Sequence, residues 1–445
     1  MTYQEFKDAA FAQALALGAR AAEGVYIENE NFRVGILSGE IDSYSVSNAY
    51  GFGLRVELDG KNGYAYTENF SDPAQLAARA VDNARAIDSE DLSPMQGAQA
   101  YEAVKEPEQP VCDMNPEQRI ALARRLEQAA AQADEKITRV QATSLSCGNS
   151  RLHISNTLGL DASRQSRSSL AYTVPIAMQP DSDEQRDGLA FRSGKDILDI
   201  DGCAKEAAEN AAAMLGASPA PSGTYAIILK NTAACDFFEA FSDIFSAESA
   251  QKGLSPLSGR EGEDIASPCV TICDDPFDAR SPRAFDDEGT PSCATTLIKD
   301  GIFTGFLHNL KTARKAGAES TSNAYRASAA SPVSIAPTNF ILSPGTDSYE
   351  TLLGKLESGL VITDVSGLHA GLNPISGDFS LLSSGFLVEN GKIVRPVDRI
   401  TIAGNFLSLL KDILCTGSDV RVSPTSNGIF ALPSLLIREL MVAGE

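Results

Sequence analysis

Several residue types are scarce in this 445-residue chain, and their scarcity excludes classes of protein. The sequence contains no tryptophan and only three histidines, and no two histidines lie close together. None of the eight cysteines falls in a Cys-x-x-Cys motif, so the common zinc and redox patterns are missing. The sequence also lacks a Walker loop and a Gly-x-Ser-x-Gly elbow, which argues against a P-loop nucleotidase and an α/β-hydrolase.

Positively charged residues are also few. The chain has 37 Lys and Arg against 59 Asp and Glu, a formal net charge of −22. Because phosphate binding needs clustered Lys and Arg, this balance argues against a nucleic-acid partner. No apolar run reaches the length of a membrane span, and the first twenty residues lack the basic flank and apolar core of a signal peptide. We therefore expect no membrane partner and a cytoplasmic location.

Residues 1–216 are predicted to form an N-terminal domain that ends at the Pro-, Gly- and Ser-rich stretch "LGASPAPSGTY". Within this domain the same order of elements occurs twice. Helices expected at 2–19 and 72–88 enclose strands near 24–36, 41–57 and 63–66; helices expected at 115–135 and 197–214 enclose strands near 137–145, 150–156 and 168–179. Asp72 and Asn115, each before a proline, are expected to cap helices. This order predicts an antiparallel sheet covered by helices.

Residues 222–445 are predicted to form a β-rich domain with a barrel or a strongly curved sheet. Short apolar runs separated by Gly, Asn-Gly and Asp-Gly turns follow one helix, expected at 235–252. "LIKDGIFTGF" and "FLVENGKIVRPV" are clear hairpin patterns. The whole chain is therefore expected to be an α+β protein.

The helix at 235–252, "CDFFEAFSDIFSAESAQKG", contains an altered metal-binding pattern. Histidines at positions 238 and 243 would give His-Glu-x-x-x-His, a helical zinc site with a general base. The chain instead has Phe238, Glu239 and Asp243. Apolar residues at three- and four-residue spacing also fit an ordinary core helix, and periodicity alone favours that interpretation.

Three weaker patterns have ordinary structural explanations. Gly51-Phe52-Gly53 lacks the rest of a dinucleotide loop and suggests a strand kink or bulge. His369, beside glycines, is typical of a loop. A group of carboxylates fits turn chemistry better than a cation site; it comprises Asp274, Asp275, Asp278, Asp286, Asp287 and Glu288.

Several stretches together resemble the TldD/PmbA peptidase family, also called modulators of DNA gyrase. They include "NAYGFGLRV", "FDDEGTP", "TSNAYR" and the long "SGDFSLLSSGFLVENGKIVRPVDRITIAGN", and they cover nearly the whole chain in the family's order. The last stretch is most similar to the PmbA (TldE) branch. The resemblance implies an N-terminal α/β domain, a barrel-like C-terminal domain and dimers that enclose a cavity.

The resemblance also implies that the zinc site is degenerate. In the TldD branch the two histidines of His-Glu-x-x-x-His fall on Phe238 and Asp243, and the Glu falls on Glu239. The third ligand, a cysteine, maps to residues 424–436, where this chain has none, and Cys415 does not match. The expected role is a subunit without metal or other cofactor that pairs with a zinc-bearing TldD-like subunit and acts on unfolded peptides.

Two other functions stay open at this point. The chain could be a stand-alone homodimer that binds peptides without cleaving them. It could also be an enzyme that uses Glu239, Asp243 and His369 around a different metal.

Overall fold

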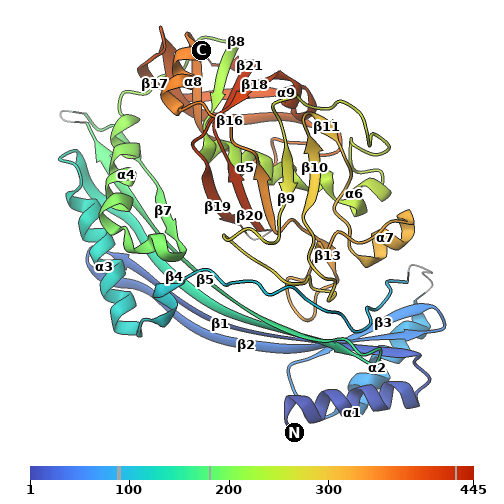
Figure 1. The fold of residues 1–445 in the computed structure, drawn as a ribbon. Coiled ribbons are helices and arrows are strands. Elements are labelled where there is room, and N and C mark those ends of the chain that lie inside the picture. The colour runs from blue at the N-terminus through green and yellow to red at the C-terminus, as the bar shows by residue number, and fades with distance from the viewer. Residues whose placement is uncertain (88–91, 180–181, 426–427, 445) are drawn as a thin grey trace.

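The N-terminal half of the computed structural model is one long, curved, antiparallel sheet that lies beneath the C-terminal half (Figure 1). The structure describes residues 1–87, 92–179, 182–425 and 428–444. The strand order is β3-β2-β1-β4-β5-β6, and β7 also pairs with β5. The strands are β1 (Ala21–Leu37), β2 (Glu40–Leu58), β3 (Lys61–Thr67), β4 (Ile137–Asn156), β5 (Asp161–Met178), β6 (Gln185–Asp187) and β7 (Ala190–Ser193).

Helices cover the two ends of this sheet, as the repeated order of elements predicts. Asp72 and Asn115 cap their helices through their side chains, which confirms both predicted caps. The first helical pair packs on Phe52 and Leu54, and the second packs on Phe32 and Val34. The helices are α1 (Tyr3–Ala16), α2 (Pro73–Ala86), α3 (Pro116–Gln132) and α4 (Ile200–Ala213), with 3-10 turns η1 (Pro110–Asp113) and η2 (Gly194–Leu198).

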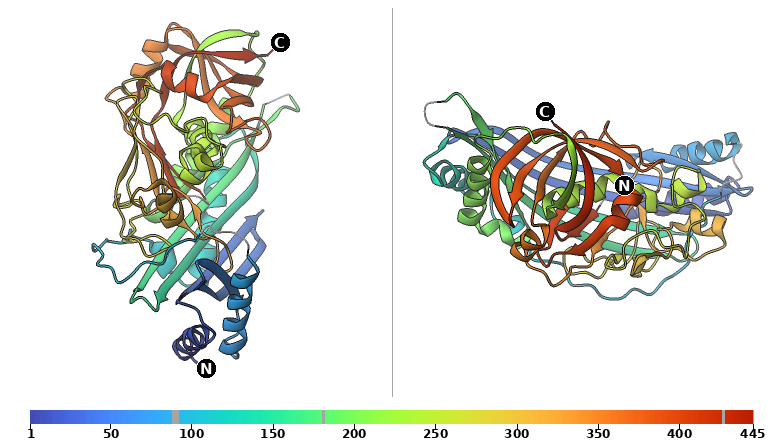
Figure 2. Two further views of the ribbon diagram at one scale, coloured as in Figure 1. Left: turned by 90° about the vertical axis from the view of Figure 1, so that its right-hand side faces the viewer. Right: turned by 90° about the horizontal axis from the view of Figure 1, so that it is seen from above.

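The opposite face of the sheet packs against the C-terminal half. Because side chains alternate along a strand, Val25 and Ile27 of β1 point away from the covering helices. They share a buried cluster with Phe285 and Ala329, which come from C-terminal loops. Figure 2 shows the C-terminal half stacked on this face of the sheet.

The C-terminal half contains a closed five-stranded barrel, as expected from its hairpins. The barrel strands are β8 (Gly223–Leu229), β15 (Gly359–Ser366), β16 (Asp378–Glu389), β17 (Lys392–Asn405) and β21 (Leu435–Ala443), closed by pairing of β17 with β21; β18 (Ile413–Thr416) also pairs with β21. A second sheet has the order β11 (Ile302–Phe303), β10 (Thr295–Lys299), β9 (Ile272–Asp274), β14 (Asn339–Leu342), β20 (Gly428–Leu432) and β19 (Arg421–Thr425). The chain is thus an α+β protein, as predicted.

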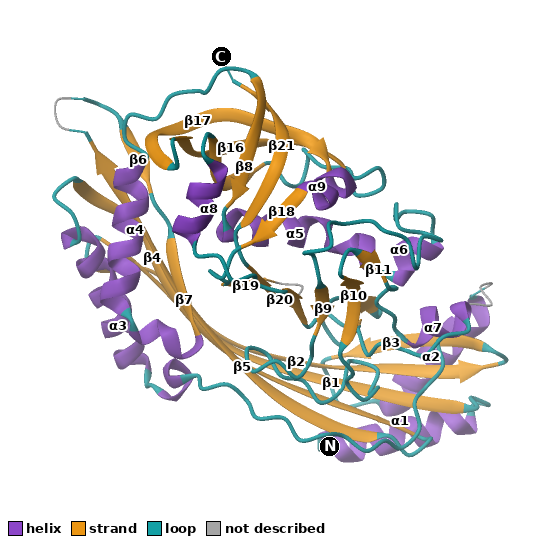
Figure 3. Ribbon diagram, turned by 45° about the horizontal axis from the view of Figure 1, so that its top comes forward, coloured by secondary structure: helices purple, strands orange, loops and turns teal. Residues whose placement is uncertain are grey.

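Short helices and one small hairpin complete this half (Figure 3). They are α5 (Asn231–Phe241), η3 (Ser242–Phe245), α6 (Ala247–Gln251), α7 (Leu310–Ala316), α8 (Tyr349–Leu356), α9 (Phe406–Asp412), and the pair β12 (Ala324–Tyr325) and β13 (Ser334–Ile335). Helix α5 contributes to a core shared by the barrel and the second sheet. None of the helices in the described ranges is long and apolar enough to cross a membrane.

Three local predictions were wrong. The helix expected at 235–252 breaks into α5, η3 and α6. The chain tightens into a 3-10 turn after Phe241, and Ser246, whose N–H donates to the Asp243 carbonyl oxygen at 3.0 Å, then adopts an extended backbone. The separate strands expected at 137–145 and 150–156 are the single strand β4, since β1 and β5 pair with it throughout the intervening polar residues. Gly51-Phe52-Gly53 forms no bulge; a Cβ at Gly53 would lie 2.2 Å from the Ala329 carbonyl oxygen, so close approach of the two halves explains this glycine.

Candidate functional site

Phe238, at the first ligand position of the zinc pattern, is a core residue. Its side chain is 1% exposed. The ring lies 5.3 Å from that of Phe406 and 6.5 Å from that of Phe340, measured between centroids. This aromatic cluster offers no donor atom to a metal and leaves Phe238 no route to water. The residues present at this position therefore do not fit zinc.

Glu239 lies at the margin of the core, on the next residue of α5. Burial raises the pKa of its half-buried carboxyl group, and a hydrogen bond with the Thr425 side chain opposes that rise. Thr425 ends β19, and its hydroxyl also donates to the Gly428 carbonyl oxygen at 3.1 Å. The fold thus brings Glu239 beside residues 424–436, the segment to which the third zinc ligand maps.

Asp243 belongs to a different local network. Helix α5 ends at Phe241, so Asp243 falls in the 3-10 turn that follows. Its exposed carboxylate accepts a hydrogen bond from the hydroxyl of Ser249, in the middle of α6, at 2.7 Å. The second zinc-ligand position therefore interacts with α6, whereas Glu239 interacts with β19.

Helix α5 carries two further titratable side chains near Glu239, Asp236 and Cys235. The sequence patterns did not indicate either of them. Asp236 lies one helical turn before Glu239; burial, together with the Asp364 and Glu239 carboxylates, raises its pKa to about 6. Cys235 is buried, and burial raises its pKa to about 12, so this thiol stays protonated at neutral pH. Its position beside the motif could have been read from the sequence, but its burial could not.

Histidine and thiol ligands from elsewhere do not complete a metal site. His369 is exposed in the loop after β15, and Cys415 is half-buried in β18. Across the described residues, no group of three or more His, Cys, Asp and Glu side chains is arranged to hold a metal ion. The geometry therefore gives no support to the hypothesis that Glu239, Asp243 and His369 share a metal.

Arg421 connects the α5 region to the N-terminal half. Its guanidinium donates to Glu206 of α4 at 3.0 Å and lies 4.4 Å from the centroid of the Phe191 ring. Glu206 also accepts from Arg192 at 2.6 Å. Arg421 also lies near Asp236, whose raised pKa it partly offsets. The α5 carboxylates thus face the interface between the two halves.

The acidic segments of the second half form a buried network rather than a cation site. Asp286 accepts hydrogen bonds from the backbone N–H groups of Glu288, Thr290 and Ala324, at 2.9 to 3.1 Å. Asp274 accepts from the N–H groups of Thr338 and Asn339, at 2.7 Å each. These bonds occupy the carboxylate oxygens, as the turn interpretation predicts.

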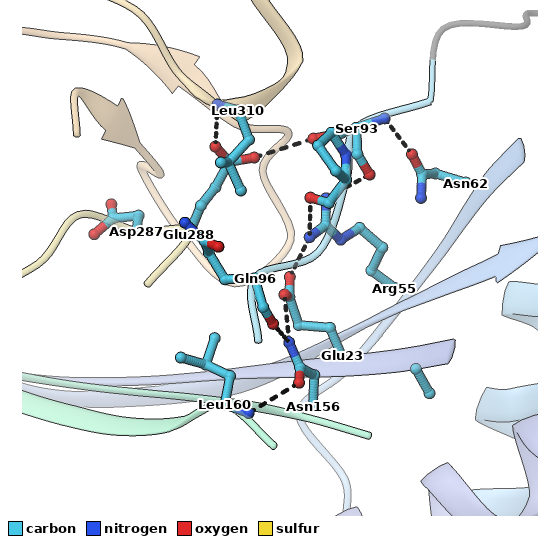
Figure 4. A network of polar contacts seen from close by, with 12 residues as sticks. Glu23, Arg55, Asn62, Ser93, Gln96, Asn156, Leu160, Asp287, Glu288 and Leu310 are labelled. Carbon is cyan, nitrogen blue, oxygen red and sulfur yellow. Dashed lines mark hydrogen bonds and ion pairs between the residues drawn. The ribbon is translucent and has the colours of Figure 1, made fainter. Parts of the chain in front are cut away.

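Glu288 carries this network across to the N-terminal half (Figure 4). It accepts hydrogen bonds from the Ser93 hydroxyl at 3.1 Å and the Leu310 N–H at 2.8 Å. Close by, Arg55 contacts Glu23 at 2.8 Å, and both side chains are almost fully buried. Burial and the neighbouring Asp286 raise the pKa of Glu288 to about 7. The network holds the C-terminal loops on the sheet.

A cavity of about 600 Å³ lies between the sheet and the C-terminal loops. Its sheet wall is mostly polar and includes Asn29, Ser150, Ser163 and Arg164; its opposite wall includes Arg283, Phe285 and Tyr325. Gly428 also lines it, and Gly428 pairs with Thr425, the partner of Glu239. The cavity therefore reaches the start of β20, which pairs with the strand end that contacts Glu239.

Comparison with known proteins decides the family. A model of the PmbA/TldA metallopeptidase C-terminal domain matches residues 222–444, and models of the central domain and domain 1 match residues 109–215 and 22–87. The chain belongs to the PmbA/TldA metallopeptidase family. The resemblance seen in the sequence is thereby confirmed.

Individual members of the family match over almost their full length. Metalloprotease PmbA of Escherichia coli O157:H7 is 27% identical and aligns over 98% of this chain and 96% of its own. A crystal structure of a putative modulator of DNA gyrase from Thermotoga maritima is 34% identical, with a TM-score of 0.91 over 99% of this chain and 100% of its own. TldE from Thermococcus kodakarensis, at 21% identity, has the same fold, with a TM-score of 0.90 over 99% of this chain and 100% of its own.

Proposed function

We propose that this chain is the subunit without zinc in a cytoplasmic, heteromeric zinc metallopeptidase that degrades or processes unfolded peptides. The zinc would belong to a TldD-like partner subunit. The observation that carries the proposal is the position of Phe238, a core aromatic residue where a zinc-binding histidine would stand. Without a metal-bound water, Glu239 has no nucleophile to activate, so catalysis falls to the partner.

The contribution of this chain would be one wall of the peptide-binding space. The cavity beside Gly428 offers Asn29, Ser150 and Ser163 as hydrogen-bonding groups for peptide amides. Such groups recognise the backbone of an extended peptide rather than particular side chains. Selection would then depend on whether a substrate is unfolded enough to enter.

Native mass spectrometry of the tagged protein, purified from its own cytosol, tests the assembly. We expect a chain without metal, bound to a second chain that carries zinc. A homodimer with stoichiometric zinc would contradict the proposal, because the donor set at Phe238 cannot hold it.

Photo-crosslinking with an unfolded peptide tests the cavity. We expect adducts on the cavity walls, and we expect the cavity-filling substitution Ser150→Trp to abolish them. The matched control is Leu158→Trp, which adds the same ring at an exposed turn of the same sheet. Equal crosslinking by both variants would exclude the cavity as the peptide site.

A second candidate function is a stand-alone homodimer that binds peptides without cleaving them. The same cavity favours it, since the cavity exists in a single chain and needs no partner residue. A homodimer without metal that still crosslinks peptide in the cavity would favour this function over the first.

A further inference from the structure

A second cavity, of about 450 Å³, lies where the edge strand β3 of the N-terminal sheet meets the loop at residues 326–332. It gathers three arginines, Arg55, Arg79 and Arg326, and none of the described residues that line it is an aspartate or a glutamate. In the whole chain, by contrast, acidic residues outnumber basic ones by 59 to 37. A cavity with this composition indicates a negatively charged ligand.

Arg55 and Arg326 form the inner wall of the cavity, and both are almost fully buried. Their side chains are 3% and 4% exposed. Arg55 stands on β2, directly opposite Glu23 of β1 and Tyr64 of β3, so these three side chains point toward the C-terminal half. Arg326 follows β12, in the loop that packs on this part of the sheet. The two guanidinium groups thus come from opposite halves of the chain.

Both guanidinium groups have N–H groups to spare. Arg55 donates to the Ser93 and Pro94 carbonyl oxygens over long distances, 3.4 Å each, and its Nε–H meets no acceptor among the described residues. One terminal nitrogen of Arg326, Nη2, likewise makes no hydrogen bond to the part of the chain that the structure describes. Because an unsatisfied buried N–H group is costly, these groups favour an acceptor that enters the cavity from outside the chain.

The charges around the two guanidinium groups also leave room for an anion. They share the carboxylate of Glu23, which lies 2.8 Å from Arg55 (Figure 4) and 3.8 Å from Arg326. Glu288 is nearby, but burial raises its pKa to about 7, so it carries only part of a negative charge at neutral pH. These two acids therefore offset the two buried cations incompletely, and a bound anion would supply the remainder.

The mouth of the cavity adds a third cation and apolar surface. Arg79 of α2 is exposed there, and its guanidinium donates to the Tyr66 carbonyl oxygen at 3.4 Å rather than to a carboxylate. Apolar groups line much of the remaining wall: Val25, Leu54, Ala65, Ala329, Ala330 and Pro332. The ligand that suits these walls is an anion with an apolar body.

We propose that this cavity binds a carboxylate that carries an apolar or aromatic group, with the carboxylate at Arg55 and Arg326 and the apolar group against the walls. A planar guanidinium matches a carboxylate in paired N–H···O bonds, and such charge-assisted bonds are strong. A bare inorganic anion would gain nothing from the apolar walls. The C-terminus of a peptide and a free small acid share this chemistry. The inference goes beyond the proposed function, because it requires neither a zinc-bearing partner nor a peptide in the larger cavity, although Arg326 lines both cavities.

Isothermal titration calorimetry of the purified full-length chain with small probes tests the ligand class. We expect N-acetyl-L-phenylalanine to bind at least about tenfold more tightly than its amide, which lacks the charge, and than acetate, which lacks the apolar group. No binding of the acid at millimolar concentration, or equal affinity for the acid and the amide, would overturn the inference. Inorganic phosphate that binds as tightly as the acid would also overturn it, because the apolar walls would then contribute nothing.

Variants at the exposed mouth test the location, since the two buried arginines also hold the halves of the chain together. We expect Ala330→Trp, which adds a large ring at the mouth, to abolish binding. Arg79→Gln should raise the Kd about threefold to fivefold, the size expected for an exposed ion pair. The matched controls Ala318→Trp and Arg85→Gln change exposed residues that line neither cavity and should bind as the wild type does. Wild-type affinity in a folded Ala330→Trp variant would place the ligand elsewhere and refute the site.

Competition with a short unfolded peptide that ends in phenylalanine identifies the source of the carboxylate. Displacement of N-acetyl-L-phenylalanine by the peptide acid, but not by its C-terminal amide, would support the inference with peptide C-termini as the ligand. No displacement by either peptide would support it with small free acids as the ligand. Equal displacement by the acid and the amide would contradict recognition of the carboxylate.

Discussion

Carboxylates are buried in two regions of this molecule, and the two regions offset the desolvation cost of burial differently. At the interface of the two halves, Glu23, Asp286 and Glu288 are fully buried, and each has a cationic or N–H partner. On α5, Asp236 and Glu239 are only partly buried, and the nearby cation, Arg421, also binds Glu206.

The difference reflects what each region does. The interface network needs its carboxylates ionised or hydrogen-bonded to hold loops on a sheet, so removing one partner leaves a buried charge behind. The α5 carboxylates are only partly buried, and their partners are the Thr425 side chain for Glu239 and Arg421 for Asp236. Substitutions of the buried interface carboxylates or their partners should therefore cost more stability than substitutions of the α5 carboxylates.

The largest effect is expected from Arg55→Ala at the interface. After this change the nearest cation to the buried Glu23 carboxylate is Arg326, at 3.8 Å instead of the 2.8 Å of Arg55. The change should lower the free energy of unfolding by about 3–5 kcal/mol. Urea unfolding followed by circular dichroism measures the loss. The double variant Arg55→Met with Glu23→Gln, which removes both charges, should lose less. A double variant as unstable as Arg55→Ala would show that packing, not the unpaired charge, sets the cost.

A smaller but still substantial loss is expected from Phe238→His, which places a histidine at the first ligand position of the zinc pattern. The imidazole would replace a ring in an aromatic cluster and bury an unpartnered N–H group, at a cost of about 2–4 kcal/mol. Phe238→Leu, which stays apolar, should cost less. Thermal denaturation measures both, and metal analysis after dialysis should find no zinc in either. Stoichiometric zinc in Phe238→His would show that the remaining ligands converge after all.

The sequence predicted the outline of both regions and missed their detail. Turn chemistry around Asp286 and the apolar stripe through Phe238 are local signals, and both predictions agree with the structure. The hydrogen bond between Glu288 and Ser93 joins residues 195 positions apart. It depends on how the two halves of the chain pack together, which no local sequence pattern encodes. The break of the predicted helix before Ser246 was missed for a similar reason, because Ala247 donates to the Leu307 carbonyl oxygen, a distant segment.

Glu288 should make stability depend on pH in a direction opposite to that of an ordinary paired carboxylate. Its pKa is about 7 when folded, against a usual value of 4.5. The folded protein therefore holds this proton more tightly, so the stabilisation is complete below about pH 4 and is lost as the pH rises toward 7. Melting temperatures from pH 4 to 8 measure the slope.

The variant Glu288→Gln isolates this contribution, because its side chain does not titrate. Its melting temperature should fall less than that of the wild type between pH 4.5 and 7. Asp236→Asn on α5 is the matched control; since the pKa of Asp236 is about 6 against a usual value of 3.8, its curve should separate from that of the wild type between about pH 4 and 6 and run parallel to it above pH 6. Parallel wild-type and Glu288→Gln curves would show that this carboxyl group is ionised throughout the range.

The smallest effect is expected from Glu239→Gln, and its smallness is the informative result. The side chain is half-buried, and an amide can keep the hydrogen bond with Thr425, so the change in unfolding free energy should stay within about 1 kcal/mol. If catalysis resides in a zinc-bearing partner, the peptidase activity of the purified assembly should also be unchanged. In a metallopeptidase that used this Glu as its general base, the same substitution would cost about 100-fold or more in rate. A loss of that size, in a variant as stable as the wild type, would mean that Glu239 of this chain takes part in catalysis. An unchanged rate would support the proposal that the α5 region has only a structural role and that this chain contributes a wall of the peptide-binding cavity.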